Sequence, residues 1–358
     1  MRLDNKLFAA FLILILTGCS VTNDAQLPQT PEVSTEASVD VKKVIRDPIS
    51  GKTSEYYYNL PPQPGANFVD TCGETIDYVD VELFTGKNNI PANFVNLHND
   101  NTIQIRWDDF RDIIDAMGTP PAGQTASNGT VPNVKWCTGT FIAADLILTA
   151  GHCFDPGGPG IEGWRNGMHV TPHFLDNEGR VASYVQADDL ALMMHVKVGY
   201  QADATNLDQL GRPIVNDAGA EYEIVELVEH WENGLDYAIA RVNNNGDTPS
   251  IAVVRDSDLE LSDEIAIIQH PRGQPKKIDV GSVSSFDGAK MYYNNLDTQG
   301  GTSGAGVLDE NGDIRGVHYG GHCSFKPFPG NVANRIEILI DASATLDRIA
   351  IPVDEDEE

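Results

Sequence analysis

From residue 136 onward, hydrophobic residues occur in short runs that are separated by turn-forming residues. Such runs are found at residues 146–148, 237–240, 265–268 and 278–283. Gly, Pro, Asn and Asp gather between them, at residues 156–160, 244–247 and 309–313. Apolar runs of this length, so often interrupted, are typical of antiparallel β structure in a sandwich or barrel. The pair Asn311-Gly312 lies between Val307 and Ile314 and predicts a β-hairpin there.

The carboxyl end follows a different pattern. Ile336, Leu339, Ile340 and Leu346 are spaced to share one face of an amphipathic helix, which we expect over residues 336–350. Residues 351–358 are mostly Asp and Glu, and we expect this acidic tail to be solvated.

The amino end begins with a targeting segment, residues 1–19. Arg2 and Lys6 precede a continuous apolar run at residues 7–16, which is shorter than the ~20 residues that span a bilayer. Residues 20–40 are rich in Pro, Thr, Ser, Gln and Glu and predict a flexible tether. The mixed residues up to 104 show no assignable fold. We interpret residues 20–104 as a linker followed by an N-terminal extension or a propeptide.

The net charge of the chain limits the kinds of molecule that we expect it to bind. The 358 residues include 24 Lys and Arg against 53 Asp and Glu, a formal charge of −29. A chain so acidic repels phosphate, so we expect no nucleic-acid partner. It also disfavours electrostatic docking on anionic lipid. With 41% hydrophobic residues, the chain can still bury a sizeable core.

One of the five cysteines lies in the targeting segment, and the other four follow it. Cys19 closes the targeting segment and leaves Cys72, Cys137, Cys153 and Cys323, an even number in an exported and oxidising context. Four cysteines allow three disulfide connectivities, among which spacing does not choose. A zinc site is the competing interpretation, but the sequence has no C-x2-C pair. We therefore expect no metal, and nothing in the sequence implies another cofactor.

Three separated segments carry the residue types that acyl transfer needs. His152 directly follows an apolar run and stands next to Cys153, with Cys137 upstream. Asp236 opens the apolar run at 237–240, where burial would keep a lone carboxylate close to a partner. Ser303 lies in the glycine-rich stretch 300–306, where the backbone can bend sharply and present N–H groups beside a hydroxyl.

Each segment is common by itself, but together they form a functional set. A Ser hydroxyl is a poor nucleophile at neutral pH unless a His accepts its proton. The His in turn needs an Asp that sets its tautomer and stabilises the imidazolium, and backbone donors must stabilise the oxyanion. We expect the N–H groups of Gly301 and Ser303 to be those donors.

Residues 105–350 resemble the trypsin-like serine proteases of the chymotrypsin fold. The stretch 148–153, Leu-Thr-Ala-Gly-His-Cys, matches the family's Thr-Ala-x-His-Cys motif, and 301–304, Gly-Thr-Ser-Gly, matches its Gly-Asp-Ser-Gly. The resemblance implies an all-β protein with two six-stranded antiparallel barrels, at about 105–245 and 246–335, closed by the helix at 336–350. It also implies a Cys137–Cys153 disulfide, which leaves Cys72 and Cys323 as a pair by elimination.

One departure from the family points to a branch of it. Thr302 replaces the Asp that pairs with a new N-terminal amine after activation cleavage in animal members. The sequence resembles bacterial glutamyl endopeptidases, which lack that Asp. By that resemblance Thr298 and His318 would bind an acidic substrate side chain at P1. The neighbouring Asp297 leaves open the alternative of a pocket for Arg or Lys.

Two Asp residues compete for the third catalytic position. Asp189 also precedes an apolar run, at residues 190–193. We prefer Asp236, because the following 265–273 segment resembles the strand after the catalytic Asp in this branch. That choice requires an inserted loop around residues 180–220.

The end of the targeting segment resembles the lipobox of bacterial lipoproteins. Residues 16–19 read Leu-Thr-Gly-Cys, and lipidation of Cys19 would anchor the mature chain to a membrane, which is its only expected membrane contact. Ser20 favours the outer membrane, and plain secretion is the alternative. The sequence as a whole predicts an exported serine endopeptidase that acts on proteins or peptides. The rival interpretations are an inactive peptide-binding pseudoprotease and a surface lipoprotein scaffold.

Overall fold

The computed structural model describes residues 72–73, 75–157, 170–208, 213–230, 234–247, 249–321, 323 and 330–352, and the backbone alone of residues 41–46 and 53–58. The predicted targeting segment with Cys19, the tether at 20–40 and residues 353–358 of the acidic tail lie outside these ranges. Strands β1 (Val41–Arg46) and β2 (Thr53–Tyr58) pair as an antiparallel hairpin. Within the described ranges, no helix has the length and apolar character needed to cross a membrane.

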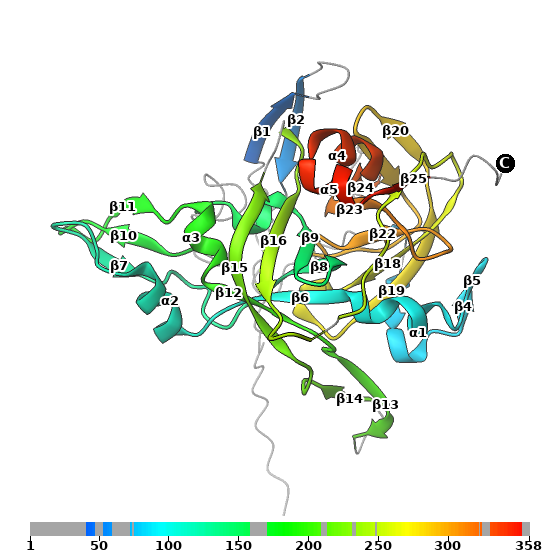
Figure 1. Ribbon diagram of the computed structural model, residues 1–358, viewed down its shortest axis with the longest axis horizontal. Helices are drawn as coiled ribbons and strands as arrows, with labels where there is room; N and C mark the ends of the chain where they lie inside the picture. Colours follow the sequence, from blue (N-terminus) through cyan, green and yellow to red (C-terminus); the bar gives the residue numbers. More distant parts are fainter. Residues whose placement is uncertain are drawn as a thin grey trace, which may run out of the picture. The chain divides into compact units, whose positions relative to one another are not determined.

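Six strands form a closed barrel in the order β12-β15-β16-β9-β8-β6 (Figure 1). They are β6 (Thr102–Trp107), β8 (Lys135–Ala143), β9 (Leu146–Thr149), β12 (Met194–Lys197), β15 (Glu221–His230) and β16 (Ala238–Asn243). The barrel closes because β12 pairs with β15 on one side and with β6 on the other. The apolar runs at 146–148 and 237–240 are thus barrel strands, as the sequence pattern predicts.

The second sheet has eight strands in the order β20-β21-β24-β23-β22-β18-β19-β3. Their bounds are β3 (Val79–Asp80), β18 (Glu264–Gln269), β19 (Lys277–Ser282), β20 (Ser285–Asp287), β21 (Lys290–Tyr293), β22 (Gly306–Leu308), β23 (Ile314–Gly320) and β24 (Asn331–Arg335). The expected hairpin around Asn311-Gly312 is present, because β22 pairs with β23 in antiparallel register.

This sheet is not the closed six-stranded barrel that the sequence predicts. The outer edge of β19 pairs with β3, a strand of the N-terminal extension. At the end of β19, the N–H of Ser282 donates to the side chain of Asn295 instead of a strand carbonyl. The chain then passes through Val283 and Ser284 into β20 at the opposite edge of the sheet. β19, which lies next to the edge strand β3, is therefore joined to the edge strand β20 by one bent stretch of chain, and no ladder of hydrogen bonds pairs β3 with β20 in the described sheet.

The residues before β6 form a run of short elements. They are η1 (Val81–Leu83), β4 (Gly86–Lys87), β5 (Ile90–Pro91), α1 (Phe94–His98) and η2 (Asn99–Asn101). Val81, Ile90 and Phe94 are almost fully buried and share a core cluster with Ile278 and Leu308 of the second sheet. The described part of the N-terminal extension therefore contributes to the hydrophobic core.

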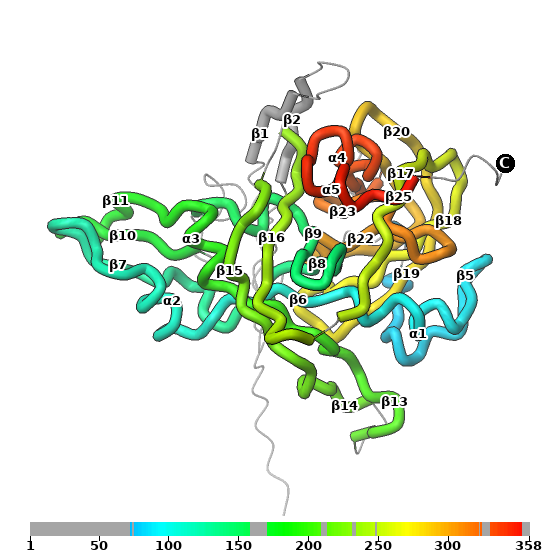
Figure 2. The backbone as a smooth tube through the Cα atoms, in the orientation of Figure 1, coloured from blue at the N-terminus to red at the C-terminus, as the bar shows by residue number. Residues whose placement is uncertain are grey.

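Insertions elaborate the closed barrel, and Figure 2 follows the backbone through them. They are α2 (Phe110–Met117), the sheet of β7 (Thr125–Ser127), β10 (His173–Leu175) and β11 (Val181–Tyr184), α3 (Ala187–Ala191), and the hairpin of β13 (Gln201–Leu207) and β14 (Pro213–Asn216). The expected loop around 180–220 is more than an insertion, because it includes the barrel strand β12 besides α3 and the β13–β14 hairpin.

The carboxyl end forms two helices where the sequence predicts one over 336–350. They are α4 (Ile336–Ala342) and α5 (Ala344–Ile349), and β25 (Ile351–Pro352) follows and pairs with β17 (Arg255–Asp256). The break falls at Ser343, which has extended backbone angles and whose hydroxyl accepts the N–H of Leu346 at 3.0 Å. This residue caps α5 in the manner typical of a Ser before a helix.

Candidate active site

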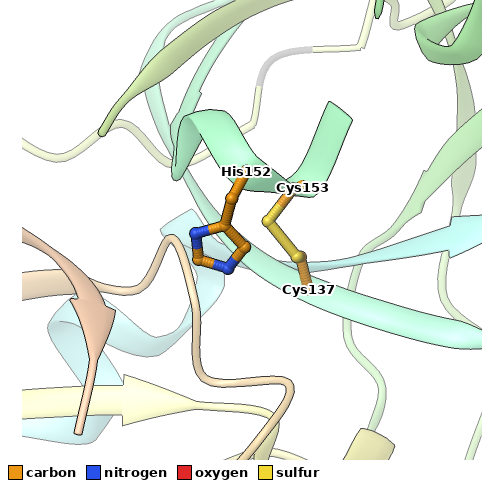
Figure 3. A group of neighbouring side chains, drawn as sticks. All are labelled: Cys137, His152 and Cys153. Atoms are coloured by element: carbon orange, nitrogen blue, oxygen red, sulfur yellow. A yellow bond between two sulfur atoms is a disulfide. The ribbon is translucent and has the colours of Figure 1, made fainter. Parts of the chain in front are cut away.

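His152 is held on a rigid turn at the end of a barrel strand. It lies in η3 (Gly151–Phe154), which starts two residues after β9 ends. A disulfide joins its neighbour Cys153 to Cys137 of β8, and Figure 3 shows the imidazole beside this bridge. The indole N–H of Trp136 donates to the carbonyl of Cys153 at 2.8 Å. The turn is therefore fixed to β8 by the disulfide and by this hydrogen bond.

Asp236 lies against His152 and uses both carboxylate oxygens on it. The backbone N–H of His152 donates to Oδ1 at 3.0 Å, and the ring Nδ1 lies 2.9 Å from Oδ2. Because a carboxylate only accepts hydrogen bonds, the Nδ1 atom carries the proton in this pair. The two side chains are 8% and 2% exposed, so water competes little for either. The pair is thus oriented with the Nε2 edge of the imidazole directed away from the acid.

Asp236 is itself tied to the second sheet. It stands two residues before β16, and its carbonyl oxygen accepts a hydrogen bond from the side-chain amide of Asn334 on β24 at 2.7 Å. The competing candidate Asp189 lies on α3 and is exposed. The structure brings Asp236, and not Asp189, to His152.

Ser303 lies next to the strand and the cystine that position His152. Its carbonyl oxygen accepts the N–H of Thr138 on β8 at 2.9 Å and lies 4.0 Å from Sγ of Cys153. The residue is half-buried. Among the described residues, its hydroxyl makes no hydrogen bond, and none joins it to His152.

The glycines around Ser303 are required by close backbone approaches. Gly304 has φ +90, and a Cβ there would lie 1.9 Å from Oγ1 of Thr149 on β9. Gly301 has φ +97, and a Cβ there would lie 2.8 Å from the carbonyl oxygen of His270. Within the described ranges, the N–H groups of Gly301 and Ser303 donate to no protein acceptor. The loop therefore leaves free the two donors that the sequence assigns to an oxyanion.

Thr302, which stands where the family has an Asp, is used inside the loop. It is fully buried, its hydroxyl donates to Oε1 of Gln269, and its Oγ1 accepts the N–H of Gln299 at 3.2 Å. Its own N–H donates to the carbonyl of Gln299 at 2.9 Å. The position thus stabilises the turn before Ser303 through neutral hydrogen bonds, with no carboxylate for an incoming amine.

The two residues expected to bind an acidic side chain are both buried, at 1% exposure for Thr298 and 3% for His318. His318 lies on β23, where its Nδ1 is hydrogen-bonded to the phenol of Tyr293 and its carbonyl accepts the N–H of Gly304. No hydrogen bond joins Thr298 to His318 among the described residues.

Burial controls the protonation of His318. Desolvation, reinforced by the neighbouring His152 and opposed by Asp236, lowers the pKa of His318 to about 3. Burial also raises the pKa of the Tyr293 phenol well above its ordinary value. At neutral pH both groups are therefore uncharged.

Asp297, the acid that would favour a basic substrate, has its carboxylate occupied. Oδ1 accepts the N–H of Cys72 at 2.6 Å, and Oδ2 accepts the N–H of Asp77 at 2.6 Å. The side chain is 2% exposed. Both oxygens thus face the N-terminal extension, which argues against their use in binding Arg or Lys.

The cysteine pairs bear on metal chemistry as well. Cys72 is joined to Cys323, and Cys137 to Cys153, so both pairings that follow from the resemblance are present. Cys137, His152 and Cys153 place possible ligand atoms within 4.8 Å of one another. Because both sulfurs are in a disulfide, neither is a thiolate ligand, and this group does not fit a metal.

Several residues of this region carry no sequence signal. Asn334 and Tyr293 contact Asp236 and His318 across 98 and 25 residues of chain. Thr138 bonds to Ser303 and, through Oγ1, to the carbonyl of Gly301 at 2.8 Å. Asn334 follows Val332 and Ala333 in β24, and nothing local to this strand indicates that its partner is Asp236.

The chain resembles solved structures at low sequence identity. No curated protein matches the sequence. Among solved structures, a Glu endopeptidase in complex with MPD is 20% identical, with 64% of this chain and 95% of that chain covered and a TM-score of 0.39. Deg5 is 15% identical, with 72% and 95% covered and a TM-score of 0.40. Rv3671c from M. tuberculosis H37Rv, in an inactive form, is 12% identical, with 71% and 90% covered and a TM-score of 0.41.

A protein-family model shows to which family the chain belongs. The model of the trypsin-like peptidase domain matches residues 137–317, just over half of the chain. The matched stretch starts at the cystine beside His152, includes Asp236 and Ser303, and ends within β23. This chain therefore belongs to the trypsin-like peptidase family.

Proposed function

We propose that this protein is a serine endopeptidase in which Ser303 is the nucleophile, His152 the general base and Asp236 its orienting acid. Ser303 Oγ attacks the carbonyl carbon of the scissile peptide bond, and its proton passes to Nε2 of His152. Asp236 holds Nδ1–H and stabilises the imidazolium. The N–H groups of Gly301 and Ser303 stabilise the oxyanion.

The second half of the reaction uses the same groups. His152 gives its proton to the leaving amine, and the C–N bond breaks to leave an acyl ester on Ser303. A water molecule then attacks the ester, with His152 again as base, and the acid product and free Ser303 are released.

The observation that carries the proposal is the buried His152–Asp236 pair beside the backbone of Ser303. The hydroxyl itself is not bonded to the imidazole. Hydrogen bonds between catalytic groups are often long in the absence of substrate and tighten in the complex. A side-chain rotation of Ser303 about χ1 would change that distance without moving the backbone.

Hydrolysis of casein by the purified mature protein, with Ser303→Ala prepared in parallel, tests the proposal. We expect hydrolysis by the wild type, its loss on treatment with an irreversible serine-directed reagent, and almost none in the variant. A folded wild type that binds casein without cleaving it would support the inactive peptide-binding alternative. A protein that neither binds nor cleaves would support a scaffold role.

For the substrate we propose a peptide with Glu or Asp at P1, bound by Thr298 and His318. Because Tyr293 is a protonated phenol, it donates to Nδ1 of His318, and the neutral imidazole then keeps its proton on Nε2. That N–H and the Thr298 hydroxyl would each donate to the substrate carboxylate. The occupied carboxylate of Asp297 supports this choice over a basic side chain.

A peptide library that varies only P1 tests the preference. Hydrogen bonds to a charged group are worth about 1.5–3 kcal/mol each, or roughly 10- to 150-fold in rate. His318→Ala should therefore lower kcat/KM for Glu substrates by this factor and leave substrates with neutral P1 residues nearly unchanged. Cleavage mainly after Arg or Lys would refute the acidic preference.

We further propose that the chain is exported and lipid-anchored through Cys19 at the bacterial outer membrane, with protein or peptide substrates there. The lipobox-like residues 16–19 support this. The mass and N-terminal sequence of the mature protein show whether the chain begins at a lipidated Cys19. A mass that includes acyl chains on Cys19 is expected, and an unmodified chain starting elsewhere would favour plain secretion.

A further inference from the structure

The N-terminal extension contacts the loop that precedes Ser303, which the proposed mechanism leaves unexplained. We define the strap as Cys72 with residues 75–83, and the active-site loop as residues 297–302. We propose that the strap is a permanent positioning element of the active protein, and that Asp297 is the residue through which it holds the active-site loop. The inference rests on the proposed serine peptidase function.

The main contact is a carboxylate captured by backbone donors. The N–H groups of Cys72 and Asp77 donate to different oxygens of Asp297, each at 2.6 Å. Hydrogen bonds to an ionised acceptor are about twice as strong as neutral ones. Burial raises the pKa of Asp297, and these two N–H groups act in the opposite direction. The strap thus supplies the donors that a buried carboxylate requires.

Further contacts fix the strap in place. The phenol of Tyr78 donates to Oε1 of Gln299 at 2.8 Å, so a second residue of the active-site loop is held. Cys72 is joined to Cys323. Asp80 of β3 forms an ion pair with Lys277, and Val81 of η1 is buried in the core. The strap is therefore bound covalently, by strand pairing and by packing.

The active-site loop is also held by the last residue of β18 and by the segment that follows this strand. The side-chain amide of Gln269 donates to the carbonyl of Asp297 at 2.8 Å, and the N–H of Arg272 donates to the carbonyl of Gly300 at 2.6 Å. The loop thus has two sets of donors, and among the described residues Asp297 and Gln299 are its members that hydrogen-bond to the strap. Loss of the strap's grip would leave the loop anchored on one side, with the N–H groups of Gly301 and Ser303 less well placed.

The test is the rate at which diisopropyl fluorophosphate labels Ser303, followed by mass spectrometry. This small reagent carries no P1 side chain, so its rate reports the nucleophile and the oxyanion donors separately from the specificity pocket. In Asp297→Asn one acceptor oxygen is replaced by an N–H donor, and in Asp297→Ala both are lost. A misplaced catalytic loop costs up to about 100-fold in rate. We expect labelling to slow about 10-fold in Asp297→Asn and more in Asp297→Ala, with kcat for peptides falling and KM nearly constant.

Asp309→Asn is the matched control. Asp309 is a buried acid that also accepts two backbone N–H groups, from Asn311 and Asp313, but it lies in the β22–β23 turn. This variant should lose thermal stability and label at the wild-type rate. Tyr78→Phe removes only the hydrogen bond to Gln299 and should be labelled a few-fold more slowly than the wild type. This less disruptive variant keeps the test possible if Asp297→Ala does not fold.

The outcomes separate the two claims. A wild type that is not labelled at Ser303 overturns the proposed function and this inference with it. A labelled wild type, together with Asp297→Asn and Tyr78→Phe that label at the same rate below their melting temperatures, overturns the strap alone. In that case the strap would be scaffold without influence on the active-site loop.

Discussion

Two buried histidines with different hydrogen-bond partners lie close together in this site. His152 has a carboxylate partner in Asp236, whereas His318 faces the phenol of Tyr293 and is held neutral by burial and by His152. Only His152 has a carboxylate hydrogen-bonded to its ring, whereas the ring of His318 is hydrogen-bonded to a neutral phenol. His318 therefore links protonation to folding stability.

The first prediction concerns acid stability. The pKa of His318 is about 3 in the folded protein, against 6.5 for the ordinary group. Between these values the unfolded chain binds a proton that the folded chain does not, so the free energy of unfolding falls as pH drops below about 6.5. The loss from this group should reach about 2 kcal/mol at pH 5. Urea unfolding at pH 7 and 5, with Ser303→Ala as background to prevent autolysis, measures it.

His318→Gln provides the comparison for that experiment. The variant has no imidazole to protonate, so its free energy of unfolding should fall by about 2 kcal/mol less between the two pH values. Parallel losses in the two proteins would show that His318 does not carry this linkage.

Individual residues differ in how far sequence could reveal them. His152 and Ser303 are marked by neighbours within six residues, because the turn and the glycine loop are local structures. Asp236 needed a choice against Asp189, and only the fold shows that Asp189 is on a helix surface. Asn334 and Tyr293 could not be assigned, since their partners are distant in the chain and the contact exists only after both sheets pack.

At the scale of elements, the loop from Gly301 to Gly304 is shaped by what lies behind it. Gly304 is wedged against β8 and β9, with a would-be Cβ 2.2 Å from the carbonyl of Thr138. Atoms of β8 and β9 leave no room for a Cβ at position 304, so a glycine is required there. This glycine in turn allows Ser303 to lie beside the cystine.

The second prediction separates crowding from backbone strain. Gly304→Ala and Gly246→Ala both put a Cβ at positive φ, +90 and +86, but only Gly304 has atoms in the way. Strain at such an angle costs about 1–3 kcal/mol, and forced overpacking adds about 1–3 kcal/mol more. Thermal unfolding should show Gly304→Ala to be the less stable by the second amount, with activity lost. Equal destabilisation would mean that the loop can move away from β8 and β9.

Element-scale features show where sequence patterns were sufficient. Apolar runs and the Asn311-Gly312 turn gave strands and a hairpin, because both signals are local. The open second sheet could not be foreseen: β19 pairs at its edge with β3, and Val79 and Asp80 form too short a segment to be recognised as a strand. The prediction of a single helix at 336–350 was wrong for a local reason, because Ser343 ends one helix and caps the next. The spacing of the apolar residues gives no sign of this break.

At the scale of the whole molecule, the charge of −29 sets the approach of substrates. A negative protein repels acidic peptides at long range, so a preference for Glu at P1 has to come from contacts inside the pocket. Binding of Glu inside the pocket is then favourable, whereas the long-range electrostatic effect on acidic peptides is unfavourable. The two effects can be measured separately.

The third prediction uses salt to separate them. Two peptides with the same Glu at P1 carry Lys or Glu at distant flanking positions. Raising ionic strength shortens the Debye length, so kcat/KM should fall for the Lys-flanked peptide and rise for the Glu-flanked one, each by about 3- to 10-fold. The Glu-over-Gln preference at P1 should stay nearly constant. Salt dependence that is identical for both peptides would show that net charge does not steer substrates to this site.

The fourth prediction addresses catalysis itself. Exposed Asp189→Asn should retain full activity, whereas Asp236→Asn should lose about 10⁴-fold in kcat because the imidazole adopts the wrong tautomer. Inactivation by Asp189→Asn instead would assign the acid to α3.

The turnover of Ser303→Ala, His152→Ala and the double variant on one peptide substrate shows whether Ser303 and His152 act together in catalysis. The single variants should each lose about 10⁴- to 10⁶-fold in kcat, and the double variant little more, because the two residues act as one unit on the same proton. Losses that multiply in the double variant, or a Ser303→Ala protein that keeps its activity, would contradict catalysis by Ser303 and His152.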